Sequence, residues 1–316
     1  MELNLINKTK ITVLCGGWSA EREISLKTGA AVFESLKELN LNSSLMDLKS
    51  EQEALAIDSS IGLAYIALHG RGGEDGFIQR ILEKKKIKYT GSSSSVCNLA
   101  MNKIEAKKVW IKEGLLTPSF LELSYQSAGE DHEEKGYGIS SLSDVLKKEW
   151  PVVVKPCREG SSFGISIVKK HSRNLEEEIH EARKYDDSVI IESFIEGREL
   201  TVPILDQRAL TPISIIPNSE FYDFDAKYER TDTQYVRSDL SLERTEEVKR
   251  LSLEAYNALG CKGWARVDLI ESLDNNFYLI EINTVPGLTK TSLFPKSAAL
   301  EDISFNQLIL EMLKTA

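Results

Sequence analysis

The chain has 316 residues, which is enough for two or three domains with hydrophobic cores of their own. Its formal net charge of −10 at pH 7 argues against nucleic acid as the main partner, because binding to phosphates requires a basic surface. No apolar run approaches the ~20 residues of a membrane span, and four widely spaced cysteines without a C-x-x-C pair disfavour a zinc site or disulfides and predict a cytoplasmic protein.

The first predicted unit is a buried strand at residues 10–15, a turn at Gly16-Gly17 and an amphipathic helix that begins near Glu23. Strand, glycine turn and helix in this order open an α/β sandwich, in which ligands bind near the carboxyl end of the strand. The G-x-G-x-x-G pattern of a dinucleotide site is absent. Glu21 precedes the helix, and the alternative to a role in a site is compensation of the helix dipole there.

A second buried strand is predicted at residues 63–68 and is followed at once by H-G-R-G-G-E-D-G. So many glycines at a strand end indicate backbone that adopts positive φ or lies close to another group. His69 stands at the strand exit, and from the residues alone a core histidine that pairs with backbone is favoured. Helix is predicted over residues 75–85, and a further helix contains M-N-K, with Lys103 near a domain junction.

Residues 122–137 are polar and acidic without an apolar period, which predicts a surface loop. Two antiparallel strands follow at 150–154 and 165–168, joined by K-P-C-R-E-G-S-S-F-G with Lys155 at its entrance. The N–H groups, hydroxyls and lysine of such a tip can fold over phosphates as a flap, and the alternative is a tip that contacts nothing. A Walker loop is excluded, because G-K-[ST] occurs nowhere in the chain.

The next part of the chain combines short strands with one long connection. Asn174 is predicted to cap a helix, and residues 188–202 contain two strand-like runs around a turn. The long aromatic and charged segment 218–234 is interpreted as a lid, because long structured loops in compact domains are usually functional. Residues 242–259 predict an amphipathic helix.

A β-hairpin near the C-terminus is the strongest pattern, with alternating runs at 264–270 and 277–282 around a polar turn. Glu281 and Asn283 are two positions apart on the second strand and therefore project to the same face. Asp268, on the first strand, joins them if the pairing register allows.

Two carboxylates and an amide oxygen form an oxygen-only ligand set, which suits Mg²⁺ or Mn²⁺ bound together with substrate phosphates. The alternative is a solvated polar face, but both strands are densely apolar, and carboxylates in such a run are costly unless paired or bound to metal. Arg266 points to the same face as Asp268 and supplies a positive charge beside an anion. The T-V-P-G-L-T turn that follows the hairpin offers N–H groups to a developing negative charge.

Taken together, the co-linear motifs resemble the D-alanine–D-alanine ligase family of the ATP-grasp superfamily over essentially the whole chain. The segments that carry the resemblance are G-G-W-S-A-E-R-E-I-S, A-L-H-G-R-G-G-E-D-G, V-V-K-P-C-R-E-G-S-S-F-G, F-Y-D-F-D-A-K-Y, A-R-V-D and E-I-N-T-V-P-G-L-T-K-T-S.

This resemblance implies an α/β (α+β) protein with a three-domain ATP-grasp fold. The expected units are an N-terminal α/β substrate domain at 1–98, a central subdomain with the flap at 99–191, and a C-terminal subdomain with lid and hairpin at 192–316. The implied reaction joins two D-alanines through an acyl phosphate formed from ATP, for synthesis of peptidoglycan precursors. ATP is expected between the central and C-terminal units, and the resemblance suggests a homodimer.

Roles for individual residues are also implied by the resemblance. The residues expected at the reacting groups of the first D-alanine and of the tetrahedral intermediate are Glu21, Ser161, Tyr228, Arg266 and Gly287. Those expected at the substrate carboxylates are His69, Ser292 and Leu293. Those expected around ATP are Lys103, Lys155, Ser162, Glu192, Phe194, Ile195, Glu199, Lys227 and Ile280. The expected ligands of two Mg²⁺ (or Mn²⁺) ions are Asp268, Glu281 and Asn283.

Three departures from the family pattern concern the surroundings of the site. Trp18 replaces a smaller residue beside Glu21, Cys157 stands where serine or alanine is usual, and the T-Q-Y-V-R-S-D-L segment lacks the proline that commonly follows the lid. Cys157 is either a reactive thiol or, as favoured, a small packed side chain.

Two other functions are considered. One is a ligase that joins D-alanine to D-lactate or D-serine, which Tyr228 disfavours because lactate-selective members lack this tyrosine. The other is a catalytically silent ATP-binding regulatory protein, which would be expected to lose the ligand residues that this chain retains.

Overall fold

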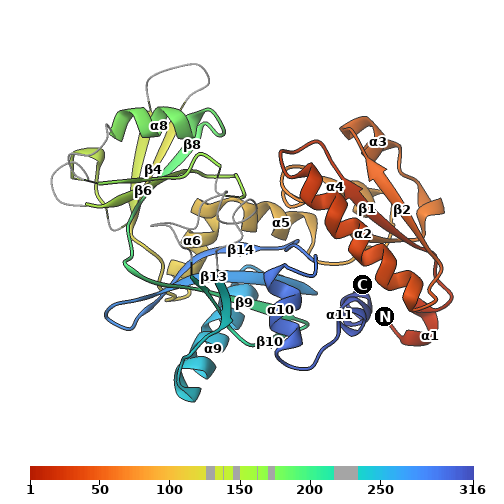
Figure 1. The fold of residues 1–316 in the computed structure, drawn as a ribbon. Helices are drawn as coiled ribbons and strands as arrows, with labels where there is room; N and C mark the ends of the chain where they lie inside the picture. The colour runs from red at the N-terminus through yellow and green to blue at the C-terminus, as the bar shows by residue number, and fades with distance from the viewer. Residues whose placement is uncertain (126–131, 138, 145–149, 162, 170–174, 217–233) are drawn as a thin grey trace.

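The computed structural model describes residues 1–125, 132–137, 139–144, 150–161, 163–169, 175–216 and 234–316, and it has the α/β character expected from the sequence. Three separate sheets organise the described residues, as Figure 1 shows. No helix in these ranges combines the length and apolar character needed to cross a bilayer.

The N-terminal sheet is parallel, with strand order β2-β1-β3, and the predicted strand–turn–helix opening is confirmed. Gly16 adopts φ +84°, and a Cβ there would lie 2.1 Å from an Asp47 carboxylate oxygen, so only glycine fits this turn. The elements of this part are α1 (Leu3–Ile6), β1 (Ile11–Gly16), α2 (Arg22–Glu38), β2 (Ser43–Leu48), α3 (Glu51–Ala56), η1 (Ser59–Ile61), β3 (Leu63–Ile66) and α4 (Phe77–Lys84).

The C-terminal segment returns to this first sheet through two helices that the sequence analysis did not predict, α10 (Leu293–Ala299) and α11 (Phe305–Lys314). Leu308 and Leu313 of α11 are fully buried in the same apolar cluster as Val13 of β1. The N and C termini accordingly lie close together in Figure 1.

Instead of one helix around M-N-K, the structure has α5 (Ser94–Met101) and α6 (Lys103–Lys112). Asn102 separates them because its backbone leaves the helical region, and its side chain accepts a hydrogen bond from the Glu105 N–H group at 3.1 Å. An asparagine N-cap of this kind starts a new helix. Lys103 is therefore the first residue of α6.

The predicted loop at 122–137 is wrong, because this region contains two antiparallel strands, β4 (Phe120–Tyr125) and β5 (His132–Tyr137). Leu121 and Leu123 are fully buried, whereas Glu122 lies on the other face and pairs with Lys108 on α6 at 3.1 Å. Strand β5 is at the sheet edge, where exposed charged side chains are common. The charged side chains masked the alternation of polar and apolar residues from which strands are predicted.

The central sheet has the order β5-β4-β8-β6-β7 and is antiparallel throughout. Helix α8 (Leu175–Arg183) packs on it through Leu175 and Ile179, and Asn174, its predicted cap, lies outside the described residues. The predicted antiparallel pair around the flap is confirmed. The remaining strands of this sheet are β6 (Val152–Pro156), β7 (Ser166–Val168) and β8 (Ser188–Ser193).

The C-terminal sheet is antiparallel, with the order β12-β11-β9-β13-β14 and β10 beside β9. The predicted hairpin is confirmed as β13 and β14, and helix α9 packs beneath them with Val248 and Ala255 fully buried. Residues 218–233 of the predicted lid lie outside the described ranges. The elements are β9 (Gly197–Leu205), β10 (Arg208–Ala209), β11 (Ile213–Ile216), β12 (Gln234–Arg237), α9 (Leu242–Ala258), β13 (Trp264–Ser272) and β14 (Phe277–Asn283).

The two strand-like runs within 188–202 belong to different sheets. Strand β8 ends at Ser193 in the central sheet, and β9 begins at Gly197 in the C-terminal sheet. A connection of only three residues therefore joins the middle strands of the two sheets, and two of its residues, Phe194 and Ile195, line a cavity between the sheets.

Candidate active site

Two neighbouring cavities lie where the sheets approach one another. Cavity A has a volume of about 260 Å³ and is lined by α2, the segments after β3 and β6, β12, the β13–β14 hairpin and residues 285–293. Cavity B has a volume of about 370 Å³ and lies between the central and C-terminal sheets. Glu281 lines both cavities, so they meet at the hairpin.

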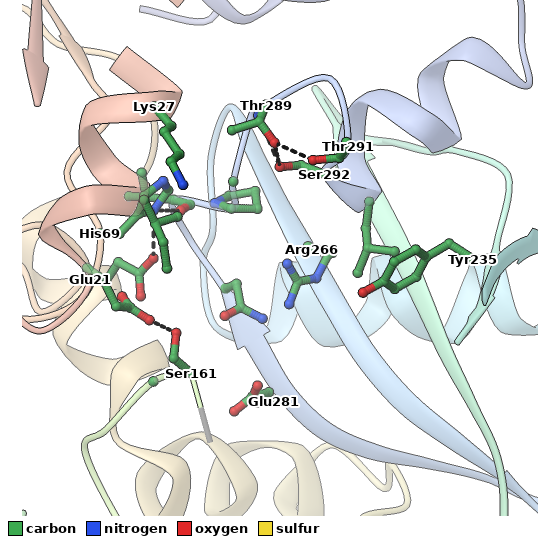
Figure 2. A pocket seen from close by; sticks show the side chains of 18 residues that line it. Glu21, Lys27, His69, Ser161, Tyr235, Arg266, Glu281, Thr289, Thr291 and Ser292 are labelled. Carbon is green, nitrogen blue, oxygen red and sulfur yellow. Dashed lines mark hydrogen bonds and ion pairs between the residues drawn. The ribbon is translucent and has the colours of Figure 1, made fainter. Parts of the chain in front are cut away.

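Cavity A collects the described residues that the sequence analysis assigned to substrate and reaction. Figure 2 shows Arg266 between the Glu21 side of the cavity and Tyr235. The predicted residues that line cavity A are Glu21, His69, Ser161, Arg266, Glu281, Asn283, Gly287, Ser292 and Leu293. Tyr228 lies outside the described residues.

The flap tip contacts the start of α2. The Ser161 hydroxyl donates a hydrogen bond to the Glu21 carboxylate (Figure 2), so the alternative of a tip that contacts nothing is wrong. Glu21 occupies the N-cap position of α2, but its side chain makes no capping hydrogen bond and lines cavity A. A Cβ at Gly160 would lie 3.3 Å from a Glu21 carboxylate oxygen, so this glycine allows the flap to approach.

His69 is buried at the exit of β3, and both of its ring nitrogens contact protein atoms. Nδ1 lies 2.9 Å from the carbonyl oxygen of Val285, and Nε2 lies 2.9 Å from the Thr28 hydroxyl. Burial acts to lower the pKa of His69, but the Glu74 carboxylate, 3.5 Å from Nδ1, raises it above the ordinary value. The ring thus joins β3 to the segment after β14, and it pairs with backbone as the residue pattern alone favoured.

The hairpin register brings Asp268 opposite Glu281 and Arg266 opposite Asn283, which confirms that these side chains share one region of the ladder. Arg266 donates to Asp268 from Nε at 2.9 Å and from Nη2 at 2.6 Å. The Thr201 hydroxyl donates to the same carboxylate at 2.6 Å. Buried Asp268 is therefore well supplied with donors.

The donor set fits a hard divalent cation. Asn283 Nδ2 lies 3.0 Å from Asp268 Oδ2, and rotation of this amide would present its oxygen instead, which gives an all-oxygen set with Glu281. Lys103 Nζ lies 3.3 Å from Glu281 and offsets its charge. Within the described residues, no group of three or more His, Cys, Asp or Glu side chains is arranged for a metal, so an amide oxygen is needed to complete the set.

Cavity B collects every described residue that was assigned to ATP, namely Lys103, Lys155, Glu192, Phe194, Ile195, Glu199 and Ile280. Lys155 Nζ lies 2.6 Å from Glu192 Oε2, and both side chains are buried. Lys103 also donates to the carbonyl oxygen of Glu159 at 2.6 Å, which ties α6 to the flap. Ser162 and Lys227 lie outside the described residues.

Some residues of cavity A were missed in the sequence, notably Lys27, Glu74, Thr289 and Tyr235. Lys27 lies three positions after Ile24, which also lines the cavity, but only the structure places Ile24 there. The Thr289 hydroxyl lies 2.8 Å from the hydroxyl of Ser292, and no spacing rule predicts that contact.

Two of the three departures from the family pattern, Trp18 and Cys157, have local explanations. Trp18 packs edge-on against Phe77 and over Gly72, where a Cβ would lie 2.5 Å from the indole. Cys157 is fully buried, its Sγ lies 2.8 Å from Asn102 Oδ1, and burial raises its pKa to about 11. A thiol in this state is a packed side chain and a poor nucleophile.

Comparison with known proteins now decides the family. A family model described as "D-ala D-ala ligase C-terminus" matches residues 109–314. The chain is 39% identical over 310 residues to a D-alanine–D-alanine ligase of Mannheimia succiniciproducens, and the match covers 98% of each chain. The chain belongs to the D-alanine–D-alanine ligase family. The resemblance seen in the sequence is thereby confirmed.

Solved structures of ligases agree with this family at the level of fold. A D-alanine–D-alanine ligase of Bacillus anthracis, solved as a complex with ATP, superposes with a TM-score of 0.80 at 32% identity over 97% of both chains. The VanG D-Ala:D-Ser ligase of Enterococcus faecalis superposes with a TM-score of 0.82 at 25% identity, covering 97% of this chain and 98% of the other. The architecture of the ligase family is therefore present across the chain.

Proposed function

We propose that the protein joins two D-alanine molecules into D-alanyl-D-alanine for peptidoglycan precursors, with conversion of ATP to ADP and phosphate. In the first step a carboxylate oxygen of one D-alanine attacks the γ-phosphorus of ATP, which gives an acyl phosphate and releases ADP. In the second step the amine of the other D-alanine attacks the acyl carbon, loses a proton, and expels phosphate. The observation that carries this proposal is the meeting of cavities A and B at Glu281, within a chain of the ligase family.

Cavity B is the proposed ATP site. Lys103 and Lys155 supply positive charge for the phosphates, as does Lys227, which is assigned from the resemblance alone. Ser162 is assigned to the flap contacts on the same basis. The connection between the two sheets supplies apolar contacts for the base, while carboxylates accept hydrogen bonds from the adenosine. The residues proposed for adenine and ribose are Glu192, Phe194, Ile195, Glu199 and Ile280.

Asp268, Glu281 and Asn283 are the proposed ligands of two Mg²⁺ or Mn²⁺ ions. When bound, the ions would offset phosphate charge. Arg266 and the N–H group of Gly287 are proposed to stabilise the oxyanion of the tetrahedral intermediate, since fixed donors in a water-poor site do so without reorganisation.

The remaining residues of cavity A are proposed to hold the two substrates. Glu21 accepts from the ammonium group of the first D-alanine, with Ser161 and Tyr228 linked to it by hydrogen bonds. His69 is assigned to the side of cavity A that faces the carboxylate of the first D-alanine. The second carboxylate is held by Ser292 and the backbone of Leu293.

The test is release of phosphate from ATP and Mg²⁺ with D-alanine alone and with D-alanine plus D-lactate or D-serine, with product masses recorded. Release with D-alanine alone, together with the mass of the dipeptide, is the expected result. The likeness to a D-Ala:D-Ser ligase makes the mixed product the second candidate, although the curated relatives favour the dipeptide. Binding of ATP without release for any pair would contradict the proposal and favour the silent regulator.

The cellular compartment, the oligomeric state and the division into units are also proposed. The four cysteines are buried and unpaired with one another, which supports a reducing cytoplasm. A homodimer and three units at 1–98, 99–191 and 192–316 are carried over from the resemblance. The core shared by β1 and α11 would make the end of the chain part of the first unit's packing.

A further inference from the structure

Lys107 on α6 is a fully buried cation that lines neither cavity A nor cavity B. Its Nζ donates to the Thr117 hydroxyl at 2.6 Å and to the carbonyl oxygen of Leu279 at 3.4 Å. It also lies 3.1 Å from Glu192 Oε1. Removing the charged ammonium group of a lysine from water costs free energy, and interactions with these neighbours must offset that cost.

Glu192 has one lysine beside each carboxylate oxygen. Lys155 Nζ lies 2.6 Å from Oε2, and Lys107 Nζ lies 3.1 Å from Oε1. Each lysine therefore forms an ion pair with a different oxygen of the same carboxylate. The two lysines differ in access, because Lys155 lines cavity B and Lys107 does not.

The charge states agree with this arrangement. Burial raises the pKa of Glu192 by itself, but Lys107 and Lys155 more than offset it and hold the pKa below the ordinary value. Burial lowers the pKa of Lys107 to about 8, against the attraction of Glu192. Glu192 is therefore held in its ionised form between the two lysines.

From this geometry we infer that Lys107 is a positioning residue for nucleotide binding. It remains as the counter-ion of Glu192 when Lys155 turns its ammonium group toward a phosphate of ATP. Without Lys107, that turn would leave Glu192 buried and unpaired, so the carboxylate would hold Lys155 back. The inference rests on the proposed assignment of cavity B to ATP.

The first experiment compares Lys107→Met with the parent enzyme at pH 7. It measures kcat, the KM for ATP, the KM for D-alanine and the Kd for a non-hydrolysable ATP analogue. We expect the KM and Kd for the nucleotide to rise roughly 10-fold, which is typical when a residue that supports a ligand-contacting side chain is removed. The KM for D-alanine should stay unchanged. Nucleotide affinity within twofold of the parent in a folded variant would overturn the inference.

A matched control is Lys108→Met on the next position of α6. Lys108 is partly exposed and pairs with Glu105 at 2.8 Å and Glu122 at 3.1 Å, outside both cavities. Its replacement should leave the nucleotide affinity unchanged. Lys107→Arg, which keeps the charge, should restore at least part of the lost affinity; no recovery in a folded Lys107→Arg enzyme would contradict the ionic role.

Two further variants keep the inference testable. In a Glu192→Gln background, Lys107→Met should have little further effect on nucleotide Kd, because no buried carboxylate remains to be paired; an equal effect in both backgrounds would overturn the inference. If Lys107→Met alone does not fold, the nucleotide Kd of the double variant is compared with that of Glu192→Gln. Lys155→Met tests the assignment of cavity B, since unchanged nucleotide affinity there would contradict the proposed ATP site itself.

Discussion

The Ser161 hydroxyl donates a hydrogen bond to the Glu21 carboxylate, although 140 positions separate the two residues in the chain. This contact connects the flap between β6 and β7 with the first turn of α2. It forms one wall of cavity A.

Removal of that link is the first prediction. Ser161→Ala should raise the KM for the first D-alanine by roughly 10-fold, since a typical charge-assisted hydrogen bond contributes about 1.5–3 kcal/mol. The KM for ATP should change little. Initial rates over a range of D-alanine concentrations measure both constants, and Ser124→Ala on β4 is the control. An unchanged KM for D-alanine would show that the contact has no part in binding.

Asp268→Asn should increase the Mg²⁺ concentration needed for half-maximal activity by roughly 10–100-fold, because an anionic ligand is lost. Titration of activity with Mg²⁺ measures this. Asp274→Asn is the matched control, since this exposed residue lies in the turn of the same hairpin. Equal Mg²⁺ dependence of the two variants would contradict the ligand assignment.

Arg266→Ala should lower kcat by about 10²–10³-fold, in line with removal of an oxyanion donor. Steady-state rates at saturating ATP and D-alanine measure kcat, and Arg250→Ala on the exposed side of α9 is the control. A change confined to KM would indicate that Arg266 binds the ground state only. Part of any loss would reflect Asp268, which accepts two hydrogen bonds from this guanidinium.

His69 should make stability depend on pH. Its pKa in the folded protein is raised above the ordinary 6.5, so the folded state holds the proton more tightly than the unfolded chain. The resulting stabilisation is complete below pH 6.5 and is lost as pH rises through the raised pKa. In this window the melting temperature of the parent should therefore fall more steeply with rising pH than that of His69→Gln. His180→Gln, on α8, should retain the parent's slope; equal slopes for all three would exclude His69 as the source.

Leu308→Ala should destabilise the protein by about 2–5 kcal/mol, because this fully buried leucine of α11 packs into the core that contains β1. Denaturant unfolding measures the free energy of unfolding. Leu300→Ala is the control, because that leucine is 43% exposed. A loss below 0.5 kcal/mol for Leu308→Ala would mean that α11 contributes little to this core.

Much of the hairpin could be predicted from the sequence, because alternation fixes which side chains of a strand share a face. That Asp268 lies opposite Glu281 could not be predicted, because the pairing register shifts between Asp268 and Leu269. The strand β5 was not predicted either, because an edge strand with a charged outer face lacks the usual alternation. The distant contacts between α11 and β1 depend on tertiary packing, which no local pattern records.

Lys107 illustrates why parts of the site escape such reasoning. Its neighbours in sequence are lysines and apolar residues of an ordinary helix, and its burial follows from the approach of Thr117, Glu192 and Leu279. Glycine motifs and the hairpin carboxylates have a recognisable spacing. A buried counter-ion has none.

Glu281 lines both cavities, and this has a thermodynamic consequence. A ligand in cavity B that interacts with the Glu281 carboxylate changes the electrostatic field in cavity A, so the two binding equilibria are linked. Such linkage is reciprocal: if nucleotide strengthens the binding of the amino acid by some factor, the amino acid strengthens the binding of nucleotide by the same factor. One carboxylate can thereby make each ligand an effector of the other.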